Sequence, residues 1–475
     1  MLDLDPAAIC DIDAASDLRS ALSGRIREAV QSTDTPGVVR VRVPVPGPVH
    51  PIDWVRAQPS TEAAYWSGRA ATRTVAASGA ADVASSASAP IDYDALGRAL
   101  TDRLDDASPL ARYYGGVRFD AAQPKAPNRP DARWAPFGTY RFVLPRFELI
   151  ESGDRRRLAC NLVLPRDADR VGEIVAALDA MALPVPDKHT SLPCPYHRQD
   201  VPDHEEWTRM VRWALDAIEG GRLDKVVLAR RVALALGAAM DPLLVLSHLE
   251  PATPGCYHFA VRPANGSAFV GASPERLFRR KGDQVVSEAV AGTRPRGETD
   301  SEDAALREAL LNSPKERREH AFVRDAIRDD LETVCTSVHV PDEVGELALA
   351  RGRHLHARLT GTLRPGTTTT DILKELHPTP AVGGVPTEDA VAAIRAQEPF
   401  DRGWYAGPVG WVGREDAEFT VGLRAGLVEE DRMALFSGAG IVDGSAPDRE
   451  WEEIEQKIGD FAAIMGVTDA QTASR

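Results

Sequence analysis

The stretch HEEWTRMVRWALDAIEGGRLDKVVLARRVAL, residues 204–234, sets the structural pattern for the second half of the chain. Apolar residues recur every three or four positions from His204 to Glu219, which indicates a helix with one buried face. Gly220 and Gly221 are typical of a helix end. The apolar run that starts at Lys225 then predicts a buried strand. The stretch therefore joins a helix to a strand through a short glycine turn.

Strands and long helices alternate from this stretch to the C-terminal end of the chain. Apolar segments at 256–261 and 268–272 bracket a turn. Residues 302–334 predict a helix that is interrupted at Ser313-Pro314, because proline lacks the backbone N–H that a helix interior needs. This alternation indicates a mixed α/β (α+β) fold.

Residues 1–203 are predicted to be a scaffold that belongs to the same fold. An opening helix is followed by strands at 39–43, 140–144 and 158–164. Residues 70–90 are rich in Ala and Ser and poor in large apolar residues, so we expect a mobile surface loop there. The proline-rich stretch 183–202 is predicted to connect the scaffold to a catalytic region, residues 204–475.

The composition indicates a folded protein of the cytoplasm. Hydrophobic residues make up 43% of the chain and charged residues 27%, as in ordinary globular proteins. Charged residues interrupt every apolar run before it could span a membrane. The start, Met1-Leu-Asp-Leu-Asp, lacks the basic segment of a signal peptide.

Charge and cysteine content exclude several classes of partner and site. A net charge of −15 argues against nucleic acid and anionic membrane surfaces as partners, although it permits a local cluster of cations that binds a small anion. Five cysteines without a CxxC spacing argue against a disulfide framework and a structural zinc site. We expect them to be buried thiols: Cys10, Cys160, Cys194, Cys256 and Cys335.

Two predicted helices turn carboxylates toward their apolar faces. With Glu316 at zero on a helical wheel, Glu319 lies at about −60° and Val323 at about −20°. With Glu450 at zero, Glu453 lies at about −60° and falls on the apolar face of a second helix. Salt-bridged helix faces would explain any one of these residues. Because the pattern occurs twice, and unpaired buried carboxylates are costly, Mg²⁺ with oxygen ligands is the favoured explanation.

Candidates for acid–base chemistry and anion binding lie in the same region. Lys225 opens an apolar strand, where burial would favour the neutral amine that acts as a general base, although a strand-end lysine can also reach solvent. Glu275 follows a strand in a Ser-Pro-Glu turn and is a candidate general acid, although most turn glutamates are structural. Arg424, in a predicted strand 419–424, is a candidate carboxylate clamp. Glycine-rich turns at 291–297, 381–384 and 437–441 are candidate anion-binding nests.

Ten ordered blocks of sequence resemble the signature series of the chorismate-utilising enzymes. These blocks are LDKVVLARR, GASPERLF, AVAGTRPRG, SPKERREH, RHL, HPTPAVGG, FDRGWYAGPVGW, VGLRAG, FSGAGIV and EWEEIEQK. The resemblance covers residues 204–465 and is loose before them. The family includes isochorismate, salicylate, anthranilate and aminodeoxychorismate synthases. The resemblance implies a large chorismate-binding fold with packed sheets, outer helices and a deep active-site cleft.

The resemblance also implies a role for each matching residue. Lys225 matches the base that activates water, and Glu275 matches the acid that protonates the departing 4-hydroxyl group. Glu319 and Glu453 match the principal Mg²⁺ ligands, with Glu316 and Glu450 beside them. The residues that match positions around the substrate are Thr293, His354, Ala381, Tyr405, Arg424, Gly438, Gly440 and Lys457.

Within the family, the sequence favours an isochorismate synthase. Ammonia-using relatives have a non-basic residue where this chain has Lys225, and they depend on a glutaminase subunit, which we therefore do not expect. Salicylate synthases share the lysine and remain an alternative, but the segment around Ala381 looks more like isochorismate synthases. A non-catalytic chorismate-binding protein would have lost an acid, a base or a metal carboxylate, and none is lost here. Quinone and siderophore synthesis both stay open as destinations of the product.

Overall fold

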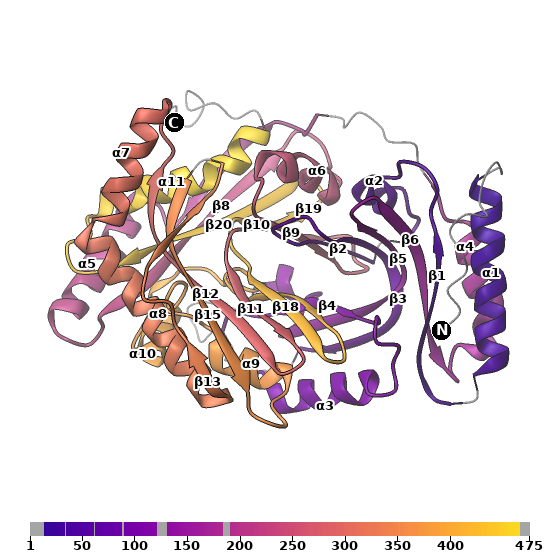
Figure 1. The fold of residues 1–475 in the computed structure, drawn as a ribbon. Coiled ribbons are helices and arrows are strands. Elements are labelled where there is room, and N and C mark those ends of the chain that lie inside the picture. The colour runs from indigo at the N-terminus through magenta and orange to yellow at the C-terminus, as the bar shows by residue number, and fades with distance from the viewer. Residues whose placement is uncertain are drawn as a thin grey trace.

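Strand pairing joins the two halves of the chain into one folded unit (Figure 1). The computed structural model describes residues 14–33, 35–60, 62–87, 90–120, 131–183, 191–350 and 352–465. In this part of the chain, 20 strands form one continuous hydrogen-bonded network. All of the strand pairs within it are antiparallel.

The strands are β1 (Gly37–Pro44), β2 (Ala63–Ser67), β3 (Thr74–Ser86), β4 (Tyr113–Val117), β5 (Tyr140–Ser152), β6 (Arg155–Leu164), β7 (Pro195–Val201), β8 (Lys225–Leu236), β9 (Tyr257–Arg262), β10 (Ala268–Ser273), β11 (Arg276–Lys281), β12 (Gln284–Pro295), β13 (Cys335–His339), β14 (Gly345–Ala348), β15 (Gly352–Leu363), β16 (Gly384–Val385), β17 (Pro408–Val412), β18 (Asp416–Val421), β19 (Ala425–Glu429) and β20 (Arg432–Ile441). The helices are α1 (Ala14–Ser32), α2 (Pro51–Arg56), α3 (Tyr93–Leu104), α4 (Val171–Asp179), α5 (His204–Glu219), α6 (Pro242–Ala252), α7 (Asp300–Leu311), α8 (Pro314–Val334), α9 (Thr369–Leu376), α10 (Thr387–Gln397) and α11 (Pro447–Ile464), with short 3₁₀ turns η2 (Ala132–Trp134) and η3 (Ala168–Arg170).

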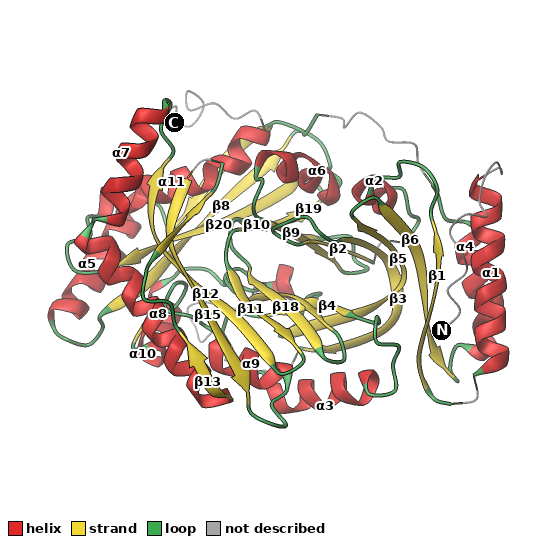
Figure 2. Ribbon diagram, viewed as in Figure 1, coloured by secondary structure: helices red, strands yellow, loops and turns green. Residues whose placement is uncertain are grey.

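The strands form two layers that meet at β5. One layer runs in the order β8, β20, β19, β10, β9, β2, β3 and β5. The other runs from β5 through β4, β17, β18, β11 and β12 to β15. Figure 2 shows helices around the outside of both layers. Helix α8 packs against β12 and β15 of one layer, and α11 packs against β20 of the other, so the two helices approach the same end of the molecule.

Aromatic side chains pack beside the layer that contains β10 and β20. The buried ring of Trp134 lies 5.4 Å from that of Phe269 on β10 and 5.8 Å from that of Phe436 on β20. Phe137 joins this cluster to Trp404, whose ring centroid is 5.4 Å away. Burial of such rings is a large apolar contribution to stability. The cluster therefore holds the loop that contains Trp404 against the sheet.

Most of the predicted elements in the second half are confirmed. Helix α5 spans His204–Glu219 and β8 begins at Lys225, as the opening stretch indicated. The break in the long helical segment falls between α7 and α8, where Ser313 caps α8 and Pro314 is its first residue. The mixed α/β fold is also confirmed.

The predicted loop at 70–90 is wrong, because β3 occupies residues 74–86. This strand lies between β2 and β5 and pairs with both. Small side chains such as Ala76 and Ala77 are buried there, since a strand with two neighbours and covered faces has little room for large ones. Residues 88 and 89 lie outside the described part of the chain.

Three strand pairs cross the predicted boundary at residue 203. They are β2 with β9, β4 with β17, and β7 with β8. The first 203 residues therefore supply strands to both layers. Of the predicted connection at 183–202, residues 184–190 lie outside the described chain, and β7 occupies 195–201.

Three of the cysteines are buried as expected: Cys160, Cys256 and Cys335. Cys194 is exposed, which corrects the prediction for this residue, because it lies at the edge of the sheet just before β7. Cys10 and the N-terminal start lie outside the described residues. Among the helices of the described chain, none is long and apolar enough to cross a membrane.

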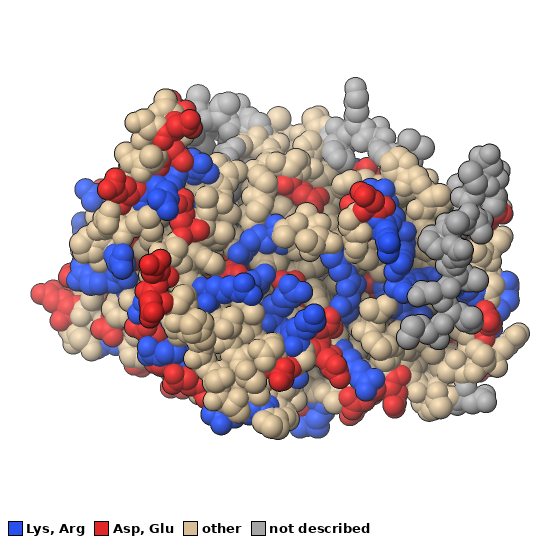
Figure 3. Space-filling view, viewed as in Figure 1, with Lys and Arg blue, Asp and Glu red and all other residues tan. Residues whose placement is uncertain are grey.

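Basic and acidic side chains alternate over the surface in spite of the net negative charge. Figure 3 shows Lys and Arg side chains gathered near the middle of the face it presents, over the region of β10, β11 and β18. The net charge therefore does not describe the local electrostatics of the molecule.

Candidate active site

A cavity of about 150 Å³ lies among β8, β12, β20, α8 and α11. Its lining comes from both sheet layers and from the loops that follow β10, α9 and α10. Every site residue predicted from the sequence lines this cavity: Lys225, Glu275, Thr293, Glu316, Glu319, His354, Ala381, Tyr405, Arg424, Gly438, Gly440, Glu450, Glu453 and Lys457. The fold thus brings together residues that are more than 200 positions apart in the sequence.

Lys225 and Glu319 form an ion pair inside the cavity. Lys225 is only 1% exposed, and its Nζ donates a hydrogen bond of 2.9 Å to Glu319 Oε1. Both side chains pass over Gly440 on β20. A Cβ atom on Gly440 would lie 2.9 Å from Lys225 Cε and 3.0 Å from Glu319 Oε1. Glycine is needed there because the ion pair occupies the space that a side chain would fill.

Glu275 is a buried carboxyl group in the connection between β10 and β11. It is 4% exposed, and burial raises its pKa to about 8, although the positive charge of Lys225 acts in the opposite direction. A carboxyl group with this pKa keeps its proton at neutral pH. Glu275 can therefore donate a proton, as a general acid must.

Each of the four predicted metal carboxylates lies beside a basic side chain. Arg294 Nη1 is 2.7 Å from Glu316 Oε1, and Lys457 Nζ is 2.8 Å from Glu453 Oε1. Lys315 Nζ is 4.0 Å from Glu450 Oε1, while Glu319 pairs with Lys225. Among the described residues, no three His, Cys, Asp or Glu side chains converge as a ready-made metal cage. Mg²⁺ commonly takes one or two carboxylates together with waters and substrate oxygens, so this oxygen-rich wall fits it.

The two carboxylates of α11 have different electrostatic surroundings. Burial and the charge of Glu453 raise the pKa of Glu450. Burial also opposes ionisation of Glu453, yet the charge and hydrogen bond of Lys457 hold the pKa of Glu453 below its usual value. The helical wheel predicted that all four carboxylates face inward. Glu316 and Glu450 are buried, at 8% and 5% exposed, whereas Glu319 and Glu453 are half-buried at the cavity.

His354 is a neutral histidine in the cavity wall. Burial lowers its pKa to about 3, and the charges of Arg424 and Lys457 act in the same direction. Its Nδ1 lies 3.2 Å from the carbonyl oxygen of Gly292 and 3.1 Å from Thr293 Oγ1. A hydrogen bond to the carbonyl places the proton on Nδ1 and leaves Nε2 as an acceptor. Nε2 is buried and has no partner among the described residues, so it is available to a bound molecule.

Two residues of the cavity wall have a left-handed backbone that L-amino acids rarely adopt. These are Ala406, with φ of 62°, and Arg424, with φ of 44°. Ala406 N donates to the carbonyl oxygen of Gly422 at 2.9 Å, so the two loops hold each other. Such strained positions are frequent at functional sites. Arg424 follows β18 instead of lying within a strand, which corrects the prediction, because the chain must turn at 422–424 to enter β19.

Two of the three predicted glycine-rich turns are strands. Residues 437–441 lie within β20 and pair with β8, and residues 291–295 lie within β12 and pair with β15 across a bulge at 291–293. Their glycines allow close approach of other groups, as Gly440 shows. Of the three, only the segment around Ala381 forms a turn.

Three charged residues of the cavity were not singled out from the sequence: Arg294, Lys315 and Arg402. All three lie inside the quoted blocks AVAGTRPRG, SPKERREH and FDRGWYAGPVGW. Lys315 directly precedes Glu316, so a search for cations next to the inward carboxylates would have found it.

The fold and cavity define an enzyme whose site brings acidic and basic side chains together from both sheet layers. The chain belongs to the chorismate-binding enzyme family, whose model matches residues 25–466. The match extends well into the N-terminal part, where the sequence resemblance was loose.

Similar proteins agree with this assignment. The chain is 35% identical over 458 residues to chloroplastic isochorismate synthase 2 of Arabidopsis thaliana, covering 90% of this chain and 81% of the relative. Its structure matches that of the menaquinone-specific isochorismate synthase MenF from Escherichia coli with a TM-score of 0.81 and 28% identity, covering 94% of this chain and all of the other. It also shares its fold with anthranilate synthase component I of Streptococcus pneumoniae, with a TM-score of 0.67, 21% identity, and coverage of 83% and 92%.

Proposed function

We propose that this protein is an isochorismate synthase, an isomerase that adds water at C2 of chorismate and removes the 4-hydroxyl group. The observation that carries the proposal is that two buried groups line one cavity, the side chain of Lys225 and the carboxyl group of Glu275, whose raised pKa favours the protonated form. The names of the similar proteins support the same reaction. The fold alone does not, since an anthranilate synthase shares it.

The proposed reaction is balanced in atoms and protons. Lys225 accepts a proton from water as the water oxygen bonds to C2 of the ring. The ring double bonds shift, and the C4–O bond breaks with a proton from Glu275, so that the leaving group departs as water. One water enters and one leaves, and solvent takes the proton from Lys225 and returns one to Glu275, so the net reaction is an isomerisation.

The remaining residues are assigned to binding. Arg424 and Lys457 supply positive charge for the carboxylates of the substrate, together with Tyr405, Gly438 and Gly440. Thr293, His354 and Ala381 line the space for the ring and its hydroxyl group. These assignments place the cations of the cavity against the charges of a dianionic substrate.

Glu319 and Glu453 are proposed to hold Mg²⁺, with Glu316 and Glu450 beside them. When bound, Mg²⁺ would neutralise the ring carboxylate and withdraw electrons from the ring as a Lewis acid. Lys225 would act as the base in its neutral form, after the proton that it shares with Glu319 has passed to solvent. Lys457 would bind a carboxylate of the substrate.

The cellular setting follows from the same proposal. We expect an enzyme of the cytoplasm that acts on a small molecule, without a glutaminase subunit and without nucleic acid or membrane partners. Its product would feed quinone or siderophore synthesis.

The experiment that tests the function is an identification of all products formed from chorismate and Mg²⁺. We expect isochorismate in a mixture with chorismate, because exchange of two similar allylic alcohols is nearly balanced in free energy. A coupled lactate dehydrogenase assay should report little pyruvate. Pyruvate equal to the chorismate consumed would identify a salicylate synthase, and an aminated product formed from ammonium would contradict the role of Lys225.

A further inference from the structure

One edge of β8 has a gap between two short neighbouring strands. On this edge β16 pairs with Lys225 and Val226, and β7 pairs with residues 231–236. In the described chain no strand pairs with residues 227–230 on this edge, whereas β20 covers the opposite edge throughout. Buried backbone groups in such a gap need other hydrogen-bond partners.

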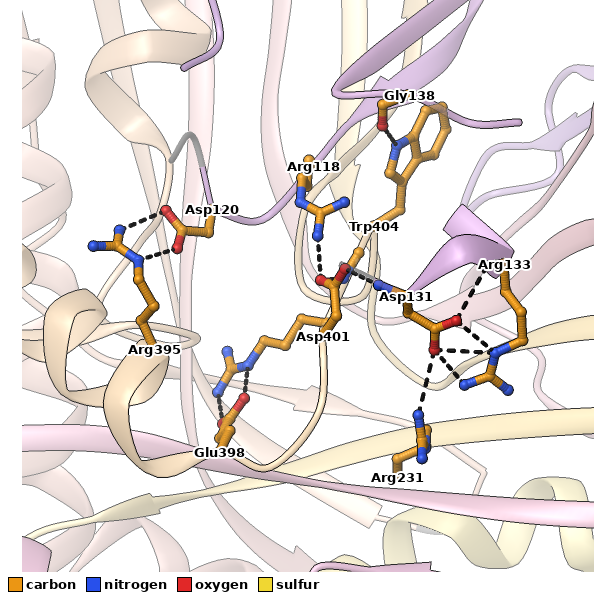
Figure 4. A network of polar contacts seen from close by, with 12 residues as sticks. Arg118, Asp120, Asp131, Arg133, Gly138, Arg231, Arg395, Glu398, Asp401 and Trp404 are labelled. Carbon is orange, nitrogen blue, oxygen red and sulfur yellow. Dashed lines mark hydrogen bonds and ion pairs between the residues drawn. The ribbon is translucent and has the colours of Figure 1, made fainter. Parts of the chain in front are cut away.

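The backbone N–H of Val227 donates to the carbonyl oxygen of Gly383 at 2.8 Å, and a buried ion pair between Glu398 and Arg402 supplies two further partners. Glu398 Oε1 accepts a hydrogen bond of 2.8 Å from the backbone N–H of Ala229. Arg402 Nη2 donates to the carbonyl oxygen of Val227 at 2.8 Å. The two side chains therefore offer β8 one acceptor and one donor, as a neighbouring strand would. Glu398 lies below the loop that carries Asp401 and Trp404 (Figure 4).

The same arginine holds a second part of the cavity wall. Arg402 Nη1 donates to the carbonyl oxygen of Val382 at 3.0 Å, beside Ala381. Its Nε and Nη2 bind Glu398 at 2.8 and 2.5 Å, and its guanidinium lies 4.4 Å from the ring centroid of Phe119. These bonds occupy most of the donors that a guanidinium has. Arg402 is therefore engaged with the protein itself more than with a bound ligand.

Stability alone does not account for this pair. Glu398 is 2% exposed and Arg402 is 5% exposed. Taking both charges out of water is costly, and replacement of such pairs by apolar residues is often neutral or stabilising. The contacts of this pair instead converge on the cavity, since Val227 is two residues from Lys225 and Val382 is next to Ala381.

We propose that Glu398 and Arg402 are positioning residues for the reaction, which hold the start of β8 and the Ala381 turn in register so that the Lys225 amine meets C2 of the substrate. This inference rests on the proposed function, because the reaction in question is the conversion of chorismate to isochorismate. An error of about 1 Å in the placement of a reacting group can lower a rate by about a hundredfold. The pair should therefore affect catalysis more than substrate binding.

The test replaces both residues by apolar ones of similar length, Glu398→Met with Arg402→Met. We expect a folded protein whose kcat for the formation of isochorismate falls by about tenfold to a hundredfold, while the KM for chorismate changes by less than about threefold. Hydrogen exchange of the amides in peptides that cover residues 225–231 should become faster. Glu398→Gln, which keeps an acceptor for Ala229, should retain more activity than Glu398→Met.

An ion pair close to the Glu398–Arg402 pair is the matched control. Arg395 on α10 makes a bidentate contact with Asp120, at 2.7 and 2.8 Å, in the same view (Figure 4). This pair adjoins the Glu398 region but neither residue lines the cavity. Asp120→Leu with Arg395→Met should leave kcat and the exchange of β8 close to wild type.

Two results would overturn the positioning role: wild-type kcat in the Met–Met variant, or a loss of kcat without faster exchange in β8. If that variant does not fold, Arg402→Lys takes its place, because lysine keeps the charge but does not reach Val227 and Val382 together. Wild-type kcat in Arg402→Lys would then overturn the role, and a fall in kcat at unchanged KM would support it. Absence of isochorismate from the wild-type reaction would refute the proposed function separately.

Discussion

At the scale of single residues, the protonation of Glu275 is the feature that most directly controls the proposed chemistry. Its pKa is raised to about 8 by burial, so the acid form predominates at neutral pH. We expect kcat/KM to fall as the pH rises through about 8, and Glu275→Gln to lower the rate by about a hundredfold or more. A pH–rate profile of the wild type, measured with chorismate in limiting amount, checks this. A rate that stays level up to pH 10 would exclude Glu275 as the acid.

The carboxyl group of Glu275 should also make the folding stability of the protein depend on pH. Between the ordinary glutamate pKa of the unfolded chain and about 8, the folded protein holds a proton that the unfolded chain releases. The contribution of Glu275 to the free energy of unfolding is therefore greatest at low pH. It is lost as the pH rises toward 8, by up to about 1.4 kcal/mol per pH unit. Glu275→Gln should abolish this slope, and thermal unfolding of both proteins from pH 5 to 8 would show it.

Residue types could be predicted from the sequence better than their contacts. The positions of Lys225 and Glu275 next to apolar strands indicated burial, and both are buried. The pairing of Lys225 with Glu319 was not predicted, because the residues lie 94 positions apart and only the folded sheet brings them together. Arg402 was missed for the same reason, since its partners Val227 and Val382 lie on separate segments.

At the scale of elements, α8 and α11 are the two walls of the proposed metal site. We expect Glu319→Gln and Glu453→Gln to raise the Mg²⁺ concentration needed for half-maximal rate by at least about tenfold, since loss of even an outer partner has that effect. Excess EDTA should stop the wild-type reaction. Titration calorimetry with Mg²⁺ would measure the loss of binding independently of turnover.

Glu452 is the control for this prediction. It directly precedes Glu453 on α11 but is exposed to solvent. Glu452→Gln should keep the wild-type dependence on Mg²⁺. Full activity of the wild type in excess EDTA, or equal effects of Glu452→Gln and Glu453→Gln, would contradict the assignment of the metal ligands.

Helices were easier to predict than the glycine-rich strands. The helical wheel located the inward faces of α8 and α11 because helical periodicity is a local property of the sequence. The segments 291–295 and 437–441 were predicted as turns because glycine favours turns, but in β12 and β20 glycine serves close packing. Only the neighbouring elements distinguish these two uses.

At the scale of the whole molecule, both halves of the chain build the two layers between which the cavity forms. The N-terminal strands β2, β4 and β7 pair with β9, β17 and β8 of the second half. The sequence indicated a scaffold there but did not predict this pairing, because strand partners far apart in the chain leave no local pattern. For the same reason β3, with its small side chains, was mistaken for a loop.

The measurement that tests the central claim most directly is the reaction of chorismate in water enriched with heavy oxygen. If water attacks C2 and the 4-hydroxyl group departs, isochorismate should carry one heavy oxygen at C2 from the earliest time points. The reverse reaction should later place heavy oxygen at C4 of the recovered chorismate, and Lys225→Ala should bind chorismate without either exchange. Isochorismate without heavy oxygen, or no isochorismate at all, would contradict the account.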